Sequence, residues 1–133
     1  MNSALQIVKN YQQSIWDSKD ISVIEKYFHD DAIIHSPVKK TKGVGELKKI
    51  IKNWHIGFPN LKVYWDDYIV ENNKVAARWH AKGCHKGSFL DLPPTTNNIS
   101  YSGVTIYQLK DTKIIEYWAF VDMEHIKSQL GAS

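Results

Sequence analysis

The chain has 133 residues, a net charge of +3, 43% hydrophobic residues and 12% aromatic residues. This balance is typical of one globular domain and excludes a disordered chain. Sixteen of the seventeen basic residues are lysines, and Arg78 is the single arginine. Because base-specific readout of nucleic acid relies on arginine, we expect no nucleic-acid partner.

Cysteine usage and the apolar runs bear on the compartment. Cys84 is the only cysteine, so no internal disulfide can form and a reducing compartment is expected. Residues 1–10 lack the apolar run of a signal peptide, and no stretch is long enough to span a membrane. We therefore expect a cytoplasmic protein with no membrane partner.

The chain opens with two predicted helices. Ser3 and Gln6 have the spacing of a capping box, which predicts a helix that runs to about Asp17. Asp20 can cap a second, shorter helix over residues 21–28. Both helices carry apolar residues on one side, so each is expected to pack against a sheet.

A short strand and the longest helix follow. Residues 32–35 read as a strand that is stopped by Ser36-Pro37, and residues 38–43 form a basic loop. Apolar residues then recur at three- and four-residue steps from Val44 to about Phe58, which predicts a helix.

After Asn60 the hydrophobic period changes to two, which indicates strands. The strands are expected at residues 61–71, 75–85, 99–109 and 113–122, and residues 87–98 form a loop rich in proline and asparagine. Helices first and strands afterwards predict an α+β fold, in which a curved antiparallel sheet wraps around the long helix. One domain is expected over residues 1–133.

The last strand carries a carboxylate that needs an explanation. Alternation places Glu116, Trp118, Phe120 and Asp122 on one face of this strand. A carboxylate beside two aromatic rings is costly to bury unless something uses it. The opposite face is apolar too, so we expect both faces to be covered, the outer one by a second copy in a homodimer.

The turn before this strand predicts how it pairs. If Asp111-Thr112 is a two-residue turn, Tyr107 lies opposite Glu116 and Thr105 lies opposite Trp118. Both hydroxyls would then join the face that carries Asp122.

The sequence resembles the SnoaL-like polyketide cyclases, also called ester cyclases, of the nuclear transport factor 2-like superfamily. The resemblance covers nearly the whole chain and is carried by these segments: Gly83-Cys84-His85-Lys86-Gly87, Leu92-Pro93-Pro94-Thr95, Tyr101-Ser102-Gly103, Lys113-Ile114, Asp122 and Gln129-Leu130-Gly131. The chain departs from the family pattern at three positions, where Cys84 replaces a threonine and Asp91 and Thr112 each replace a glycine.

This resemblance implies a cone-shaped α+β barrel, often dimeric, with a pocket between the concave sheet and the helices. It implies that Asp122 is the acid and base of an intramolecular aldol ring closure that needs no cofactor. A carboxylate can act so in an apolar setting, which raises its pKa. The substrate would be a small hydrophobic molecule rich in carbonyl groups, and the residues expected to contact it are His35, Trp54, Thr105, Tyr107, Trp118 and Phe120.

Several alternatives stay open. Asp122 could simply cap the helical segment that follows it. The protein could bind a lipophilic molecule without catalysis, since this fold alone does not define a function. His85 could brace the proline-rich loop instead of contacting substrate. A metal site is not expected, because His80 and His85 fall on opposite faces of their strand.

Overall fold

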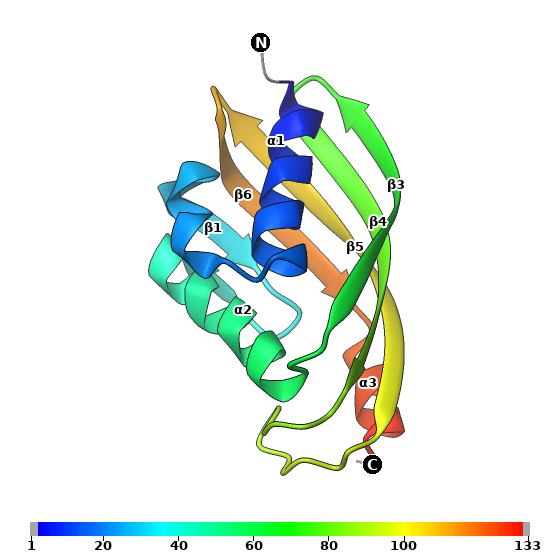
Figure 1. Cartoon of the computed structure of the whole chain (residues 1–133). Coiled ribbons are helices and arrows are strands. Elements are labelled where there is room, and N and C mark those ends of the chain that lie inside the picture. The colour runs from blue at the N-terminus through cyan, green and yellow to red at the C-terminus, as the bar shows by residue number, and fades with distance from the viewer. Residues whose placement is uncertain (1–2, 132–133) are drawn as a thin grey trace.

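The structure is a computed structural model that describes residues 3–131 (Figure 1). Its first helix, α1, spans Ala4–Gln12, and the Ser3 side chain accepts a hydrogen bond from the Gln6 N–H at 3.1 Å. The helix continues as a wider π-helical turn, η1, over Gln13–Asp17. The helix predicted to end near Asp17 is therefore present, with a different last turn.

The second predicted helix is wrong in its length and type. Residues Ile21–Lys26 form a short 3-10 helix, η2, and strand β1 begins at Phe28. Asp20 caps η2 as expected, because its carboxylate accepts from the Ser22 N–H at 3.2 Å. The helix stops because Tyr27 and Phe28 pair with β6: the Tyr27 carbonyl accepts from the Ile114 N–H at 2.8 Å.

Six strands form one sheet in the order β2-β1-β6-β5-β4-β3, in which only the β1–β6 pair is parallel. The strands span Phe28–His35 (β1), Lys40–Lys42 (β2), Lys62–Glu71 (β3), Lys74–Cys84 (β4), Asn98–Lys110 (β5) and Lys113–Val121 (β6). Strand β2 lies within the segment that was predicted to be a basic loop.

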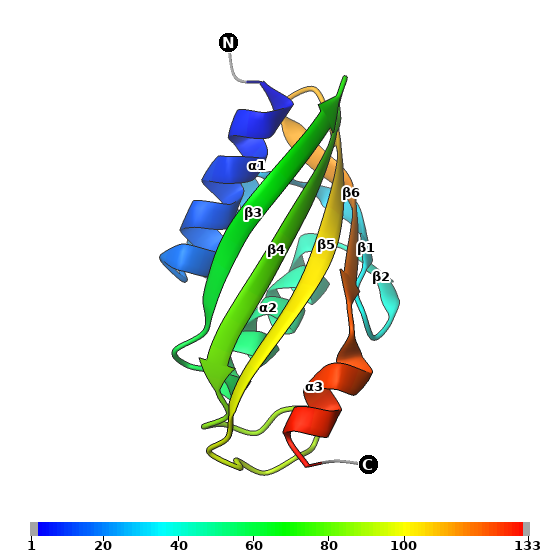
Figure 2. The ribbon, with the colours of Figure 1, turned by 90° about the vertical axis from the view of Figure 1, so that its right-hand side faces the viewer.

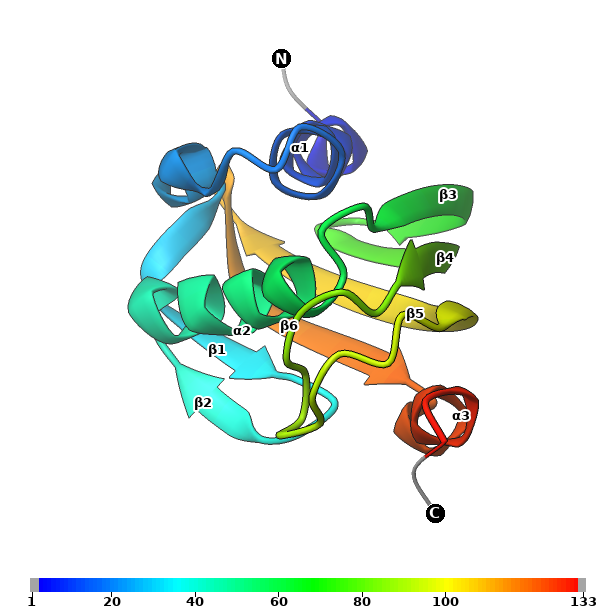
Figure 3. The same cartoon turned by 60° about the horizontal axis from the view of Figure 1, so that its bottom comes forward.

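The helices cover one face of the curved sheet. Helices α1 and α2 (Val44–Gly57) lie against the concave face, and α3 (Met123–Gln129) follows β6 at the end of the sheet (Figures 1 and 3). Figure 2 views β3, β4 and β5 from the other side, where no element of residues 3–131 covers them. The predicted α+β fold with a curved sheet around a long helix is confirmed.

The core divides into two apolar clusters along the concave face. One joins α1 and α2 to β1 and β6, with Tyr11, Phe28 and Leu47 at its centre. The other joins the end of α2 to β4, β5 and α3, with Phe58 and Tyr101 among its members. The cavity described below lies between the helices and the sheet and takes residues from both clusters.

A bulge in β6 sets which side chains face the helices. Lys110 pairs with Lys113 across the predicted two-residue turn, and Leu109 pairs with Ile114. The register then shifts by one residue, so that Gln108 pairs with Glu116 and Ile115 is the extra residue. Because strand side chains alternate, a one-residue shift changes every later cross-strand pair.

The predicted pairing of Tyr107 with Glu116 and of Thr105 with Trp118 is therefore wrong. Tyr107 lies opposite Tyr117, and Thr105 lies opposite Ala119. Each of these pairs faces inward.

Mutation of Gly103 can test the close packing around β5. A Cβ atom there would come within 2.4 Å of the Phe120 carbonyl oxygen and 2.6 Å of the Trp79 ring. Gly103→Ala should lower the free energy of unfolding by about 2 kcal/mol or more, the cost of overpacking a core. Gly45→Ala in α2 is the matched control, because no atom lies within 4 Å of its new Cβ. Urea unfolding measures both, and equal effects would contradict this packing.

The outer face of the sheet carries an apolar row across four strands. Ile69, Ala76, Ile106 and Trp118 follow one another as cross-strand neighbours, and Phe120 is 57% exposed beside them. No helix within residues 3–131 is long and apolar enough to cross a membrane. A second copy of the chain would cover this row and remove it from water.

We therefore expect a homodimer with the outer faces together. Light scattering should give about twice the chain mass of 15.4 kDa at micromolar concentration. Ile106→Asp should give a monomer because it introduces a charge into this row. Val38→Asp, at a 67% exposed site in a loop, should leave the dimer intact. A wild-type mass of one chain would exclude the dimer.

Candidate functional site

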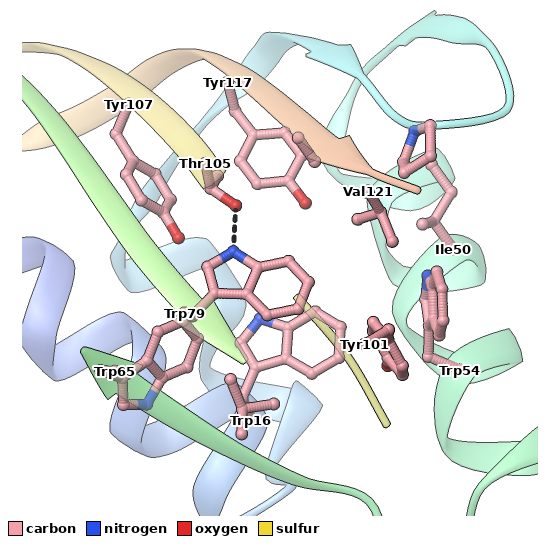
Figure 4. A pocket seen from close by; sticks show the side chains of 13 residues that line it. Trp16, Ile50, Trp54, Trp65, Trp79, Tyr101, Thr105, Tyr107, Tyr117 and Val121 are labelled. Atoms are coloured by element: carbon pink, nitrogen blue, oxygen red, sulfur yellow. Dashed lines mark hydrogen bonds between the residues drawn. The ribbon is translucent and has the colours of Figure 1, made fainter. Parts of the chain in front are cut away.

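A narrow cavity lies between the concave face of the sheet and the helices (Figure 4). Most of its wall is aromatic, and four of the five tryptophans contribute to it. Its lining residues are Trp16, Pro37, Ile50, Trp54, Val63, Trp65, Trp79, Tyr101, Thr105, Tyr107, Tyr117, Ala119 and Val121. No carboxylate, lysine, arginine or histidine is among them.

The cavity is thin. About 510 Å³ between and in front of these side chains is free of atoms, but only about 40 Å³ can hold the centre of a water-sized sphere. Pockets for drug-sized ligands usually measure about 300–1,000 Å³. The free space is therefore much smaller than in such a pocket.

The π-helical turn brings Trp16 to the cavity. The Trp16 indole N–H donates to the Tyr11 hydroxyl at 3.2 Å, and its ring packs on His55 with centroids 5.2 Å apart. π-helical turns often occur at functional sites. This turn is one structural feature of the site that hydrophobic periodicity does not predict.

The polar groups of the cavity are hydroxyl groups and indole N–H groups. The Trp79 indole N–H donates to Thr105 Oγ1 at 3.0 Å (Figure 4), and Gln12 Nε2 donates to the Tyr107 hydroxyl at 3.3 Å. Within residues 3–131 neither the Tyr101 nor the Tyr117 hydroxyl has a hydrogen-bond partner. Both hydroxyls can therefore bond to a ligand.

Burial makes these tyrosines harder to deprotonate. It raises the pKa of Tyr101, Tyr107 and Tyr117 far above the ordinary value of 10. The neighbouring Tyr117 raises the pKa of Tyr107 further. At neutral pH all three hydroxyls carry their proton, so they act as hydrogen-bond donors and not as bases.

The sheet separates the residues predicted to form one site. Trp54, Thr105 and Tyr107 line the inner cavity, whereas His35, Trp118, Phe120 and Asp122 line an open groove on the outer face, with a volume of about 570 Å³. The expectation that all seven meet in one pocket is wrong. The bulge at Ile115 is the physical reason, because it places Trp118 opposite Ile106 instead of Thr105.

The outer groove has its own polar cluster. His35 Nε2 and Glu116 Oε2 are 2.7 Å apart, and the His35 ring stacks on Trp118 with centroids 5.2 Å apart and planes 3° apart. Lys74 Nζ lies 5.9 Å from the centre of the Trp118 ring. This groove lies on the face that we expect a second copy to cover.

Asp122 occupies the helix-capping position. It is exposed, and its carboxylate accepts from the His125 N–H at 3.0 Å at the start of α3. This is the structural alternative that the sequence left open. An acid and base role for Asp122 stays a prediction.

His85 braces the proline-rich loop. It is fully buried, and its Nδ1 accepts from the Thr95 N–H at 3.2 Å. The His85 N–H and carbonyl bond to the Asn97 carbonyl and the Thr96 N–H, each at 2.9 Å. No group of three or more histidine, cysteine, aspartate or glutamate residues within residues 3–131 could hold a metal ion.

Sequence reasoning missed several residues of the cavity. Trp16, Trp65, Trp79 and Tyr101 line it, but none of them was predicted to contact the ligand. The number of tryptophans was the available signal, because five in 133 residues is high for a chain that only fills a core.

The curved sheet and helices enclose an aromatic cavity, and comparison with known proteins gives the family. A family model described as SnoaL-like polyketide cyclase matches residues 6–130. The chain belongs to this family, and the resemblance found in the sequence is confirmed. A search of curated proteins gave no match.

Solved structures share the fold at low identity. A candidate SnoaL-like polyketide cyclase from Jannaschia sp. CCS1 is 21% identical, with a TM-score of 0.91 over 98% of this chain and 92% of that one. A SnoaL-like polyketide cyclase from Agrobacterium tumefaciens C58 is 19% identical, with a TM-score of 0.81 over 98% and 100%. AclR from Streptomyces galilaeus, described as a candidate hydroxylase, is 23% identical, with a TM-score of 0.85 over 96% and 80%. These likenesses establish the fold, and their names cover more than one reaction.

His55 packs against Trp16 beside the cavity and makes the stability of the protein depend on pH. Burial lowers the pKa of His55 below its ordinary 6.5. The unfolded chain therefore binds this proton more readily than the folded protein, so stability falls as pH drops below about 6.5. Urea midpoints at pH 7 and pH 5 should differ less in His55→Phe than in the wild type. His29→Gln, at an exposed histidine, should keep the wild-type difference. An unchanged difference in His55→Phe would contradict this assignment.

Proposed function

We propose that the protein binds a small, flat, neutral molecule in the inner cavity. The observation that carries this proposal is a narrow space enclosed by four tryptophans and three tyrosines, with no charged side chain in its wall. Aromatic rings bind flat molecules through their faces and lose little side-chain entropy in doing so. A charged ligand would lose its hydration without gaining an opposite charge, so a neutral one is favoured.

A second hollow supplies the route into the cavity. It measures about 320 Å³ and shares Pro37, Ile50 and Trp54 with the cavity wall. The turn at Leu90 and Asp91 borders it, and both residues have positive φ angles, 52° and 61°. Such strained backbone is often found at binding sites. A ligand larger than one ring would extend from the cavity into this hollow.

The second candidate is a cyclase or isomerase activity, which membership of the SnoaL-like polyketide cyclase family favours. The tyrosine hydroxyls could stabilise the oxyanion of an enolate formed from a carbonyl substrate. The cavity wall holds no carboxylate or histidine to take up the proton, and Asp122 lies outside it. In this version a carbonyl-rich substrate reaches Asp122 through the outer groove. Asp122 then acts as the acid and base of an aldol-type ring closure, without a cofactor.

Indole N–H signals can locate the bound molecule. Acetophenone should shift the nuclear magnetic resonance signals of Trp16, Trp54, Trp65 and Trp79, while the signal of Trp118 stays in place. Val63→Phe should abolish these shifts, because Val63 lines the narrow cavity. Val70→Phe makes the same change at an exposed site of the same strand and should leave the shifts intact. Shifts confined to Trp118 would move the site to the outer groove.

Asp122 separates the two candidates. If it is the acid and base, Asp122→Asn should slow turnover of a 1,3-dicarbonyl substrate by roughly 10²- to 10⁴-fold. If it only caps α3, Asp122→Asn should change little, because asparagine caps about as well, and Asp122→Ala should cost about 1 kcal/mol of stability. Turnover assays and urea unfolding measure the two effects. Wild-type turnover that survives in Asp122→Asn would exclude the catalytic role.

A further inference from the structure

We propose that one end of the outer sheet face binds a doubly charged oxyanion, such as the phosphate group of a small molecule, between Lys62 on β3 and Lys82 on β4. The site lies at the end of the sheet where β5 packs beside α3 (Figure 2). This inference goes beyond the proposed function, because it does not depend on any molecule bound in the inner cavity.

Lys62 and Lys82 face each other directly. They are cross-strand neighbours in the antiparallel pair of β3 and β4, and both are exposed. Like charges at directly opposite positions destabilise a sheet. Within residues 3–131 neither lysine forms an ion pair. The fold therefore holds a repulsive pair of charges that no paired carboxylate of the described chain neutralises.

A hollow of about 440 Å³ lies beside the two lysines, and none of the described residues that line it is a carboxylate. Asn60 Oδ1 accepts from the Cys84 N–H at 2.9 Å, so the NH₂ group of Asn60 can donate to a ligand. Ser100, the cross-strand neighbour of Lys82 on β5, adds a hydroxyl. The lining residues are Asn60, Lys62, Lys82, Gly83, Asn98, Ile99, Ser100 and Gln129.

Two contacts hold this site in place. Gln129 Oε1 accepts from the Ser100 N–H at 2.9 Å, and Gln129 Nε2 donates to the Ser100 carbonyl at 2.7 Å, which ties α3 to β5. Lys62 Nζ lies 5.2 Å from the centre of the Tyr64 ring, which attracts the ammonium group. Donors that are ordered before binding lose less entropy when a ligand arrives.

The two lysine charges select the class of ligand. A singly charged carboxylate would leave one of them unbalanced, whereas a phosphate dianion balances both and can accept several charge-assisted hydrogen bonds. Asp17 does not supply this balance. Burial raises the pKa of Asp17 and the charge of Lys62 opposes that rise, but the two side chains form no ion pair.

The lysine pair lies away from the apolar row of the outer face. Lys62 precedes Ile69 by seven residues on β3, so the two are roughly 23 Å apart at about 3.3 Å per residue. A second copy of the chain centred on the apolar row need not cover the lysines. Val63 and Tyr101, next to Lys62 and Ser100 in the chain, line the inner cavity on the opposite face.

Another pair of opposed lysines provides the control. Lys110 and Lys113 are cross-strand neighbours on β5 and β6, but the turn between them carries Asp111, and neither lines the hollow. Lys110→Gln removes one exposed lysine from that pair, just as Lys82→Gln removes one from the proposed site.

Titration with inorganic phosphate at about pH 8, followed by nuclear magnetic resonance, tests the site. The side-chain signal of Asn60 and the backbone signals of Lys82 and Ser100 should shift and saturate. Lys82→Gln should weaken phosphate binding by roughly 10-fold or more, the effect of one charge-assisted hydrogen bond. Lys110→Gln should change it by less than about twofold. Equal binding in Lys82→Gln and the wild type would overturn the proposal.

Two other anions separate binding from charge screening. Sodium chloride at the same ionic strength should give no saturable shift, and the same shifts with chloride would mean screening only and would exclude the site. Acetate carries a single charge and should bind more weakly than phosphate. Equal binding of acetate would overturn the assignment to a doubly charged ligand.

Lys82→Glu tests the repulsion without a ligand. It places a carboxylate opposite Lys62, so the thermal midpoint in phosphate-free buffer should rise above that of the wild type. Phosphate should then stabilise the wild type more than it stabilises Lys82→Glu. Low phosphate concentrations are needed, because concentrated phosphate stabilises proteins in general. A Lys82→Glu midpoint at or below the wild-type value would contradict the repulsion on which the site rests.

Discussion

The composition of the cavity wall depends on one register shift between β5 and β6. Ile115 is accommodated as an extra residue, and from there to the end of β6 the pairing differs by one position from that of the turn. The inner wall therefore receives Tyr117 and Ala119, while the outer face receives Trp118 and Phe120. Without the bulge Tyr117 would face outward, and Trp118 and Phe120 would face the helices.

The neutral character of the cavity follows from this shift. With Glu116, Trp118 and Asp122 directed outward, the polar groups that face the cavity are hydroxyl and indole N–H groups. These hydroxyls are protonated at neutral pH, and burial raises their pKa further. Family membership alone would have suggested an acidic residue at the centre of the site. The chemistry of a shared fold must therefore be assigned from the side chains that face the cavity.

Much of the fold could be predicted from the sequence, because periodicity reports which side of an element is buried. The long helix from Val44 and the four long strands are present close to their predicted bounds. The helix predicted to extend to Phe28 failed because strand pairing with Ile114 overrides local propensity. The bulge could not be predicted, since Ile115 suits either face of a strand and only tertiary packing selects one. Trp54, Thr105 and Tyr107 line the inner cavity, whereas His35 and Asp122 line the outer groove, and contact of any of them with a ligand stays a prediction.

The wall between the cavity and the outer groove is a single layer of backbone. Ala119 and Val121 border both spaces, and so does Pro37 at the end of β1. A ligand that spreads the inner rings displaces the same strand that carries Trp118 and Phe120 on the other side. If two chains associate through the outer face and a ligand binds in the cavity, the two events would then be thermodynamically linked. Any factor by which association of two chains changes ligand affinity is also the factor by which the ligand changes association.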